Sequence, residues 1–304
     1  MVNTHLQPGT LWNAVLARTR HALGCGALQP IETETQVIEQ QGIPFLVRVA
    51  TNLRRKDAAR ARQAESSRAA GKPINPFQPY EEDLFVADIS PTHLCLLNKY
   101  NVIDHHLLII TRDYADQEQL INLEDFAALW ACLAEIDGLG LYNAGVTAGA
   151  SQPHKHLQLV PVPLAAGGAP IPIERAFDHL PLGAGVTQSG RLPFRHAFAW
   201  LDPLRTPSPS AAAEETFRLY GRMLAAVGIE GVADGAVVRQ SAAYNLLITR
   251  RWLLLVPRST ECFEGISISA LNFAGSMFVR DQHQLRIVEE RKPLTVLTAV
   301  GFRV

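Results

Sequence analysis

The spacing of apolar residues predicts three helices. Between residues 10 and 26, apolar side chains recur every three or four positions, which is the period of a helix with one buried face. Residues 122–137 show the same period, with Asn122 as the expected N-cap and Gly138 as the expected stop. A third helix is expected over about 210–227. After the first helix, each half of the chain therefore contains one well-marked helix.

Shorter runs of alternating or continuous apolar residues predict strands. The predicted strands are residues 33–39, 43–49, 83–89, 93–97, 107–111, 154–160, 192–199, 244–249 and 252–256. The run 245–250 resembles the order of residues in 101–112, which suggests an internal duplication. We expect two related halves, residues 1–165 and 190–304, joined by a connection at 166–189 that is rich in Gly, Pro and Ala.

The composition is that of an ordered globular protein of 304 residues, 47% of them hydrophobic and 19% charged. A net charge of −1 gives no overall field that would attract nucleic acid or an acidic membrane, so we expect neither partner. The first residues lack the basic and apolar regions of a signal peptide, and no apolar run is long enough to cross a bilayer. The cytoplasm is therefore the expected location.

Four cysteines stand far apart in the sequence, and no pair of them has the spacing of metal ligands. We expect them to be small buried residues in a reducing compartment. They are Cys25, Cys95, Cys132 and Cys262.

Residues 54–72 differ from the rest of the chain. Several lysines and arginines are set among Ala, Ser and Gln, and few apolar residues are available for burial. Two interpretations stay open: a solvated loop or exposed helix, or a cationic flap over a polyphosphate.

The most informative segment is Gly149-Ala-Ser-Gln-Pro-His-Lys-His-Leu-Gln158. Because strand side chains alternate between two faces, His154, His156 and Gln158 share one face. Two histidines and an amide are costly to bury unless each polar atom has a partner. The second half has no counterpart of His154-Lys155-His156, so we expect the chemistry in the first half.

This cluster has three interpretations. The histidines could be structural, or they could hold zinc, although no third ligand stands at supporting spacing nearby. The interpretation we favour is a nucleophile, since neutral imidazole attacks phosphorus when its other ring nitrogen is held as N–H. Backbone N–H groups of residues 149–152 could then bind phosphate oxygens, and Gln158 could donate to a non-bridging oxygen.

The same segment resembles the active-site segment of the diadenosine tetraphosphate phosphorylases, also called ATP adenylyltransferases. They belong to the galactose-1-phosphate uridylyltransferase-like branch of the histidine triad superfamily. Further segments resemble the family in the same order and cover nearly the whole chain. They are residues 75–77, 97–102, 105–108, 192–196, 244–247 and 271–275. The resemblance implies an α+β fold of the histidine triad type, with two related halves that each have a mostly antiparallel sheet and helices.

The resemblance also implies a mechanism. His156 would attack the α-phosphorus of diadenosine tetraphosphate and carry the AMP, ATP would leave, and inorganic phosphate would then release ADP. His154 and Gln158 complete the expected catalytic set. Hydrolases of the superfamily have histidine where this chain has Gln158, and an amide cannot act as a general acid, which favours transfer to phosphate. No tightly bound cofactor or protein metal ligand is expected, but magnesium is expected to accompany the polyphosphate.

Position by position, the resemblance implies nucleotide or phosphate contacts in both halves. The implied residues are Lys56, Asn143, Gly149, Ala150, Ser151, Gln152, Ser269, Ala270, Leu271, Ser276 and Arg280. We add Asn98 and Lys99, at a predicted strand end, because Lys99 could neutralise phosphate charge. The family often has Asn-Ser at positions 269–270 and lysine at position 280, so the departures concern the second base rather than the chemistry.

Other polar residues are expected to be structural. His105 and His106 precede a buried strand, where one could pack and the other could face the site, and we favour a structural role for them. The remaining candidates are expected to be surface or packing residues. These are His93, His179, His283, Arg250 and Arg251.

Two alternative functions remain. One is a hexose-1-phosphate uridylyltransferase-like nucleotidyltransferase, although the basic segment 54–72 suits a polyphosphate better than a sugar. The other is a non-catalytic nucleotide sensor, against which the intact His154, His156 and Gln158 argue.

Overall fold

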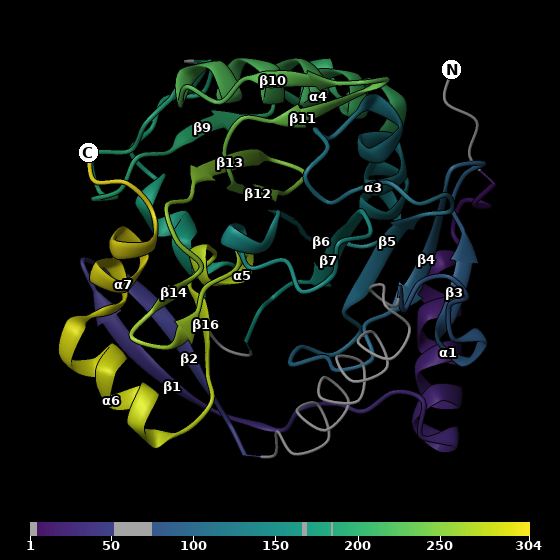
Figure 1. Cartoon of the computed structure of the whole chain (residues 1–304), viewed down its shortest axis with the longest axis horizontal. Helices are drawn as coiled ribbons and strands as arrows, with labels where there is room; N and C mark the ends of the chain where they lie inside the picture. Colours follow the sequence, from purple (N-terminus) through teal and green to yellow (C-terminus); the bar gives the residue numbers. More distant parts are fainter. Residues whose placement is uncertain (1–4, 52–74, 166–168, 184) are drawn as a thin grey trace.

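The computed structural model describes residues 5–51, 75–165, 169–183 and 185–304. Within these residues, nine strands form one sheet in the order β3-β4-β5-β7-β6-β12-β13-β9-β8, and every neighbouring pair is antiparallel (Figure 1). The strands are β3 (Phe85–Asp88), β4 (His93–Leu97), β5 (Leu107–Thr111), β6 (Gly138–Ala144), β7 (His156–Pro161), β8 (Val186–Thr187), β9 (Ala197–Trp200), β12 (Tyr244–Ile248) and β13 (Trp252–Pro257). The α+β class with antiparallel sheets is confirmed.

The sheet order is symmetric about the central pair of strands, β6 and β12. Asn143 lies opposite Asn245 in this pair, and each asparagine follows a tyrosine, Tyr142 or Tyr244. Beside β6 lies β7 and beside β12 lies β13, in each case the strand that comes next in the chain. Beyond these lie β5 and β9, each of which precedes the long helix of its half in the chain. This order agrees with two related halves, but it corrects the expected repeat, since β12 corresponds to β6 and not to the segment that contains β5.

Three helices cover one face of this sheet. They are α1 (Leu11–Cys25), α3 (Leu123–Glu135) and α4 (Pro209–Ala226). Asn122 and Asp125 form a capping box at the start of α3, as expected. Ser208 caps α4 and Pro209 occupies its first position, so this helix begins slightly before the predicted residue. Helices α3 and α4 pack on each other, with the Trp130 indole donating to Thr216 over 2.8 Å.

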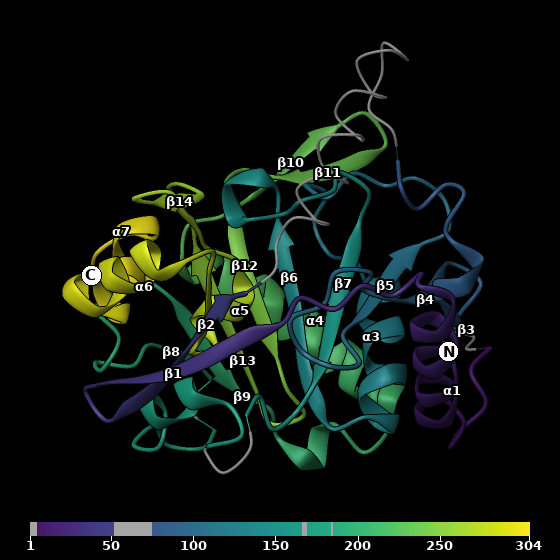
Figure 2. The same cartoon turned by 90° about the horizontal axis from the view of Figure 1, so that it is seen from below.

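The opposite face is covered in part by a second, three-stranded sheet and by short helices. Strand β2 (Ile43–Ala50) lies between β1 (Thr33–Gln40), which is antiparallel to it, and β16 (Ser276–Val279), which is parallel. The helices are α5 (Ala270–Phe273), α6 (Gln282–Arg291) and α7 (Pro293–Val300). The purple strands β1 and β2 thus lie beside the yellow C-terminal helices (Figures 1 and 2) and share one core with them.

The alternation of side chains along β7 places the predicted site between two apolar clusters. Leu157 and Leu159 point into the core under the helices. His156 and Gln158 lie on the other face, where the apolar residues form two separate clusters. A small cluster of Phe77, Leu94, Leu96 and Ile110 covers β4 and β5. A larger cluster that includes Leu141, Leu247 and Leu254 covers β6, β12 and β13. The polar strip of β7 lies between them.

The remaining elements are short. They are the 3-10 helices η1 (Glu82–Leu84), η2 (Val146–Ala148), η3 (Pro172–Ala176) and η4 (Pro203–Arg205), and the strands β10 (Gly231–Asp234), β11 (Val237–Gln240), β14 (Cys262–Phe263) and β15 (Ile266–Ser267). They connect or flank the larger elements (Figure 1).

Two predicted strands begin later than expected, and one strand was not predicted. The strand predicted over 83–89 begins as η1, and the strand predicted over 192–199 begins only at Ala197. Strand β6 was not predicted, because Gly138 is read from the sequence as a helix stop. In the structure, a Cβ at Gly138 would lie 2.7 Å from the carbonyl oxygen of Val160, so close strand approach explains the glycine.

Two further sequence expectations can be compared with the structure. Cys95 and Cys132 are buried as expected, and burial raises the pKa of the Cys95 thiol to about 12. Cys25 and Cys262 are exposed, so the expectation of burial was wrong for these two. Cys25 is the last residue of α1 and Cys262 lies in a two-residue strand, where little chain is available to cover them. Within the described residues, no helix combines the length and the apolar character needed to cross a bilayer.

Candidate active site

His156 begins β7 and is nearly fully buried. Its Nδ1 lies 2.8 Å from the backbone carbonyl oxygen of His154. A carbonyl oxygen can only accept, so Nδ1 carries the proton and donates it. The Nε2 atom therefore keeps its lone pair. Burial lowers the pKa of His156 to about 4, which keeps the ring neutral near pH 7. A neutral ring with one bare nitrogen is the form that a phosphorus nucleophile requires.

The side chain of His154 is fully buried and held at both ring nitrogens. Its Nε2 lies 2.8 Å from the carbonyl oxygen of Thr111, so Nε2 donates, and the Asn75 amide donates to Nδ1 over 2.8 Å. The Phe77 ring packs edge-on against both histidines, with centroids 5.5 Å and 5.6 Å away. Burial lowers the pKa of His154. His154 thus supplies a fixed carbonyl to His156 rather than a second free nitrogen.

Gln117, which was not predicted from the sequence, holds the backbone of His156. This buried amide accepts the N–H of His156 at 2.8 Å. Its Nε2 donates to the carbonyl oxygens of Asn143 and His156, at 2.8 Å and 3.2 Å. Gln117 therefore joins β6 to the start of β7, where the regular ladder between these strands has ended. No local pattern marks Gln117, since it lies in an irregular segment before α3.

Gln158, two residues along the same face, is partly exposed and is contacted by the residue that precedes β5. His106 lies with its Nε2 2.8 Å from Oε1 of Gln158, and the Asn98 amide lies 3.3 Å from Nδ1 of His106. Both Asn98 and His106 therefore support Gln158. His106 thus has a structural role in positioning Gln158, whereas His105 packs on Trp12 and contacts Thr19.

The glycine-rich loop is tied to the second half of the chain. Oδ1 of Asn143 accepts from the Asn245 amide and from the N–H of Ala270, each at 2.8 Å. Gly149 has φ +88° and packs where a Cβ would lie 2.7 Å from the carbonyl oxygen of Ile268. Only glycine fits this position, because both the conformation and the space exclude a side chain.

Two of the four backbone amides that were expected to bind phosphate at 149–152 are already hydrogen-bonded within the loop. The N–H of Gly149 donates to the carbonyl oxygen of Val146 at 2.8 Å, and that of Ala150 donates to Gly145 at 3.1 Å. These two groups are thus used within the loop. Ser151 is exposed and Gln152 partly exposed on the side of the loop next to His154.

Arg258 is buried and links several polar groups of the two halves, and it was also not predicted from the sequence. Its guanidinium donates to Oδ1 of Asn245 and to the carbonyl oxygens of Ala148 and Ile268, the last at 2.8 Å. It also lies over the Phe273 ring, 5.4 Å from the centroid. Burial lowers the pKa of Arg258 to about 10, so the group stays charged at neutral pH. One cation thus joins the glycine-rich loop to the segment that begins α5.

Lys155 points to the opposite face and anchors β7 to helix α3. Its Nζ lies 2.5 Å from Oδ2 of Asp125, whose Oδ1 lies 3.0 Å from Nε2 of His93. Burial alone would raise the pKa of Asp125, but the hydrogen bond from His93 and the charge of Lys155 lower it. This buried group is structural, as expected for His93.

Several predicted ligand residues lie elsewhere or have partners of their own. Lys99 pairs with Glu81, with both Nζ–O distances 2.7 Å, so a phosphate would have to displace a carboxylate. Ser276 is buried and accepts from Arg48 at 3.1 Å. Arg280 is exposed beside α6. Lys56 and the basic segment 54–72 lie outside the described residues.

Ser269, Ala270 and Leu271 are brought to the site through the start of α5. Ser269 and Asn272 form a capping box, and the N–H of Ala270 contacts Asn143 as described above. On the other side of the histidines, a pocket of about 340 Å³ is lined by Phe77, Ile110 and Thr111, among others. Phe77 and Thr111, which line this pocket, also contact His154, whereas the start of α5 contacts Asn143.

The chain matches two family models that together span most of its length. Residues 1–179 match the Ap4A phosphorylase N-terminal domain, and residues 190–303 match the ATP adenylyltransferase C-terminal domain. The division into domains at 165 and 190 stays a prediction, because the central sheet contains strands of both halves.

Curated relatives and solved structures agree with these matches. Diadenosine 5',5'''-P1,P4-tetraphosphate phosphorylase 2 of Saccharomyces cerevisiae is 26% identical over 244 residues, 72% of this chain and 73% of that protein. Protein APA1 of the same yeast is 23% identical, over 97% of this chain and 95% of that protein. The crystal structure of yeast Ap4A phosphorylase Apa2 with AMP superposes with a TM-score of 0.76 at 21% identity, covering 100% of this chain and 99% of that one. The chain belongs to the Ap4A phosphorylase and ATP adenylyltransferase family.

Proposed function

We propose that the protein is a diadenosine tetraphosphate phosphorylase, which converts diadenosine tetraphosphate and inorganic phosphate to ATP and ADP. The family matches and the yeast relative named as such a phosphorylase support this activity. Apa2 has been crystallised with diadenosine tetraphosphate, and that structure superposes on this chain with a TM-score of 0.72. The observation that carries the proposal is the bare Nε2 of His156, held by the 2.8 Å bond from Nδ1 to the carbonyl oxygen of His154.

The reaction follows from this geometry in two displacements. Nε2 of His156 attacks the α-phosphorus, the bond to the bridging oxygen breaks, and ATP leaves with the electron pair. The positive charge on the ring is shared with the carbonyl of His154 through the Nδ1 proton. Phosphate then attacks the same phosphorus, the P–N bond breaks, and ADP leaves with neutral His156 restored.

Gln158 can donate a hydrogen bond to the phosphate of the transferred adenylyl group. Its Oε1 faces His106, so its NH2 group is available to a non-bridging oxygen. Since an amide neither gives nor takes a proton at neutral pH, it does not activate water, and transfer to phosphate is favoured. Magnesium would enter with the polyphosphate as its counter-ion, and the cytoplasm is the expected place of action.

Mass spectrometry of the protein mixed with diadenosine tetraphosphate tests the proposal. Without phosphate, we expect an AMP adduct on His156, and added phosphate should discharge it as ADP. His156→Ala should form no adduct and still bind the dinucleotide, while His283→Ala, at an exposed position, should behave like the unchanged protein. AMP and ATP without an adduct would indicate a hydrolase. No products at all would favour the uridylyltransferase or sensor alternatives, to be tried with UDP-sugars.

A further inference from the structure

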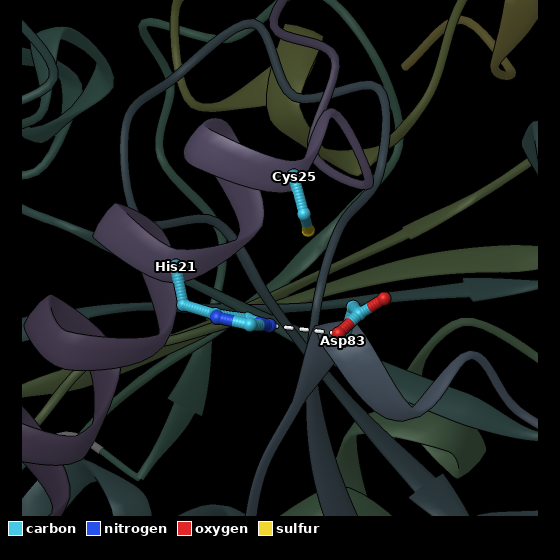
Figure 3. Close-up of side chains that lie close together, drawn as sticks. All are labelled: His21, Cys25 and Asp83. Carbon is cyan, nitrogen blue, oxygen red and sulfur yellow. Dashed lines mark hydrogen bonds and ion pairs between the residues drawn. The ribbon is translucent and has the colours of Figure 1, made fainter.

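A second group of reactive side chains lies outside the His156 site. Within the described part of the chain, His21, Cys25 and Asp83 are brought together so that one ligand atom of each lies within 4.8 Å of the other two. Figure 3 shows the three side chains directed toward a common gap between α1 and η1. All three residues are exposed.

The local structure explains why these residues meet. His21 and Cys25 are four residues apart on α1, so they lie on one face at the end of the helix. Asp83 comes from η1, which packs on that face. One turn earlier, the Arg18 guanidinium donates to the carbonyl oxygen of Glu82 over 3.4 Å, which ties η1 to the helix. The spacing His21-x-x-x-Cys25 is visible in the sequence, but Asp83 is remote in the chain.

We propose that His21, Cys25 and Asp83 form a zinc-binding site with water as the fourth ligand. An imidazole nitrogen, a thiolate and a carboxylate are the donors that Zn²⁺ accepts, whereas Mg²⁺ and Ca²⁺ select oxygen. On binding, the Cys25 thiol releases its proton to solvent. Nε2 of His21 carries the proton that it donates to Asp83, so this proton must also pass to solvent, or by exchange with solvent to Nδ1, before Nε2 gives its lone pair to the metal.

The observed distances require only small adjustments for this site to form. Nε2 of His21 and Oδ1 of Asp83 are 2.7 Å apart and hydrogen-bonded. Ligands of tetrahedral zinc lie about 3.3 Å apart for nitrogen and oxygen and about 3.6 Å apart for nitrogen and sulfur. The His21–Asp83 pair must therefore open slightly and Cys25 must approach. Side-chain exposures of 51% for His21 and 56% for Asp83 allow both movements without repacking of the core.

A metal at this place would join two parts of the N-terminal half. Helix α1 covers the core under the sheet, and η1 leads directly into β3, the strand at one edge of the nine-stranded sheet. Binding to the folded chain alone raises the midpoint of thermal unfolding. The site is separate from the nucleophile, so its role is to stabilise rather than to catalyse.

The test is a titration of the metal-free full chain with Co²⁺, followed by Zn²⁺. We expect one equivalent of Co²⁺ to produce a sulfur-to-cobalt charge-transfer band, and Zn²⁺ to abolish it. Cys25→Ser should lose the band, and His21→Ala should weaken Co²⁺ binding at least about tenfold. The matched controls, Cys262→Ser and His283→Ala, remove an exposed cysteine and an exposed histidine and should change nothing.

A second measurement separates a site from loose thiol binding. Zn²⁺ should raise the thermal unfolding midpoint of the unchanged protein and of Cys262→Ser, but not that of Cys25→Ser. Each variant lies at an exposed position, and its circular dichroism spectrum should match that of the unchanged protein. A missing band, a band that survives in Cys25→Ser, or equal thermal shifts in all variants would overturn the proposal.

Discussion

Nε2 of His106 lies 2.8 Å from Oε1 of Gln158 on the neighbouring strand. Because the Asn98 amide lies 3.3 Å from Nδ1 of His106, that nitrogen accepts and Nε2 donates. Gln158 is thereby oriented with its NH2 group away from His106. Gln158, which takes the third position of the motif, is thus positioned by a histidine that precedes the neighbouring strand β5.

We expect His106→Leu to slow formation of the AMP adduct about tenfold with little change in dinucleotide affinity, because Gln158 loses its fixed orientation. Single-turnover kinetics over a range of dinucleotide concentrations measures both quantities. His105→Asn is the matched control, since His105 packs on Trp12 and its φ of +58° suits asparagine. Equal rates for the two variants would contradict a positioning role for His106.

Gln158→His should shift the reaction toward water. A histidine at this position can donate and accept a proton, so the adenylyl group on His156 becomes accessible to hydrolysis. We expect the ratio of AMP to ADP among the products to rise at a constant phosphate concentration, as measured by chromatography. Gln158→Glu serves as a second comparison of similar size. An unchanged ratio in Gln158→His would show that the third motif position does not decide the acceptor.

Gln117→Leu should destabilise the fold around β7. The change leaves the N–H of His156 and the carbonyl oxygen of Asn143 without their partner in a buried place. We expect a loss of about 2–4 kcal/mol in the free energy of unfolding, measured by denaturant titration. Gln282→Leu, at an exposed position of α6, should cost about 0.5 kcal/mol or less. Similar losses in both variants would disprove the role given to Gln117.

Arg258→Lys should weaken the junction between the two halves although the charge is kept. A lysine cannot reproduce the separate bonds to Asn245, Ala148 and Ile268. We expect a loss of about 2–4 kcal/mol in unfolding free energy and a weaker affinity for the dinucleotide. Calorimetry with and without the ligand gives both values, and Arg286→Lys on an exposed turn of α6 is the control. If the unfolding free energy and the affinity are unchanged in Arg258→Lys, the junction does not depend on the guanidinium.

As the pH is lowered, the rate of adduct formation should begin to fall only well below pH 6.5. Burial lowers the pKa of His156 to about 4, so the ring stays neutral, and nucleophilic, as the pH falls from 8 through 6.5. The folded pKa lies below the unfolded value, so the associated stability is present above pH 6.5 and is lost as the pH falls toward 4. Single-turnover rates with diadenosine tetraphosphate in the absence of phosphate test this, with circular dichroism confirming the fold at each pH. Half-loss of the rate near pH 6.5 would contradict the burial effect.

Much of the site was visible in the sequence because its signals are local. The alternation of a strand places His154, His156 and Gln158 on one face, and residues 122–125 mark the start of α3. The family resemblance rested on segments of the same kind. Strand β6 was hidden by its glycines, because β7 approaches Gly138 closely and Leu129 of α3 approaches Gly140.

The sequence by itself determined the α+β class, the central helices and the face shared by His154, His156 and Gln158, since each depends on neighbours within a few residues. Only the tertiary structure decided which residues support His156 and Gln158. Gln117 and Arg258 satisfy buried polar groups that come from distant parts of the chain, and His106 contacts the partly exposed Gln158. A buried donor must find an acceptor wherever the packing places one, and that place cannot be read from spacing along the chain.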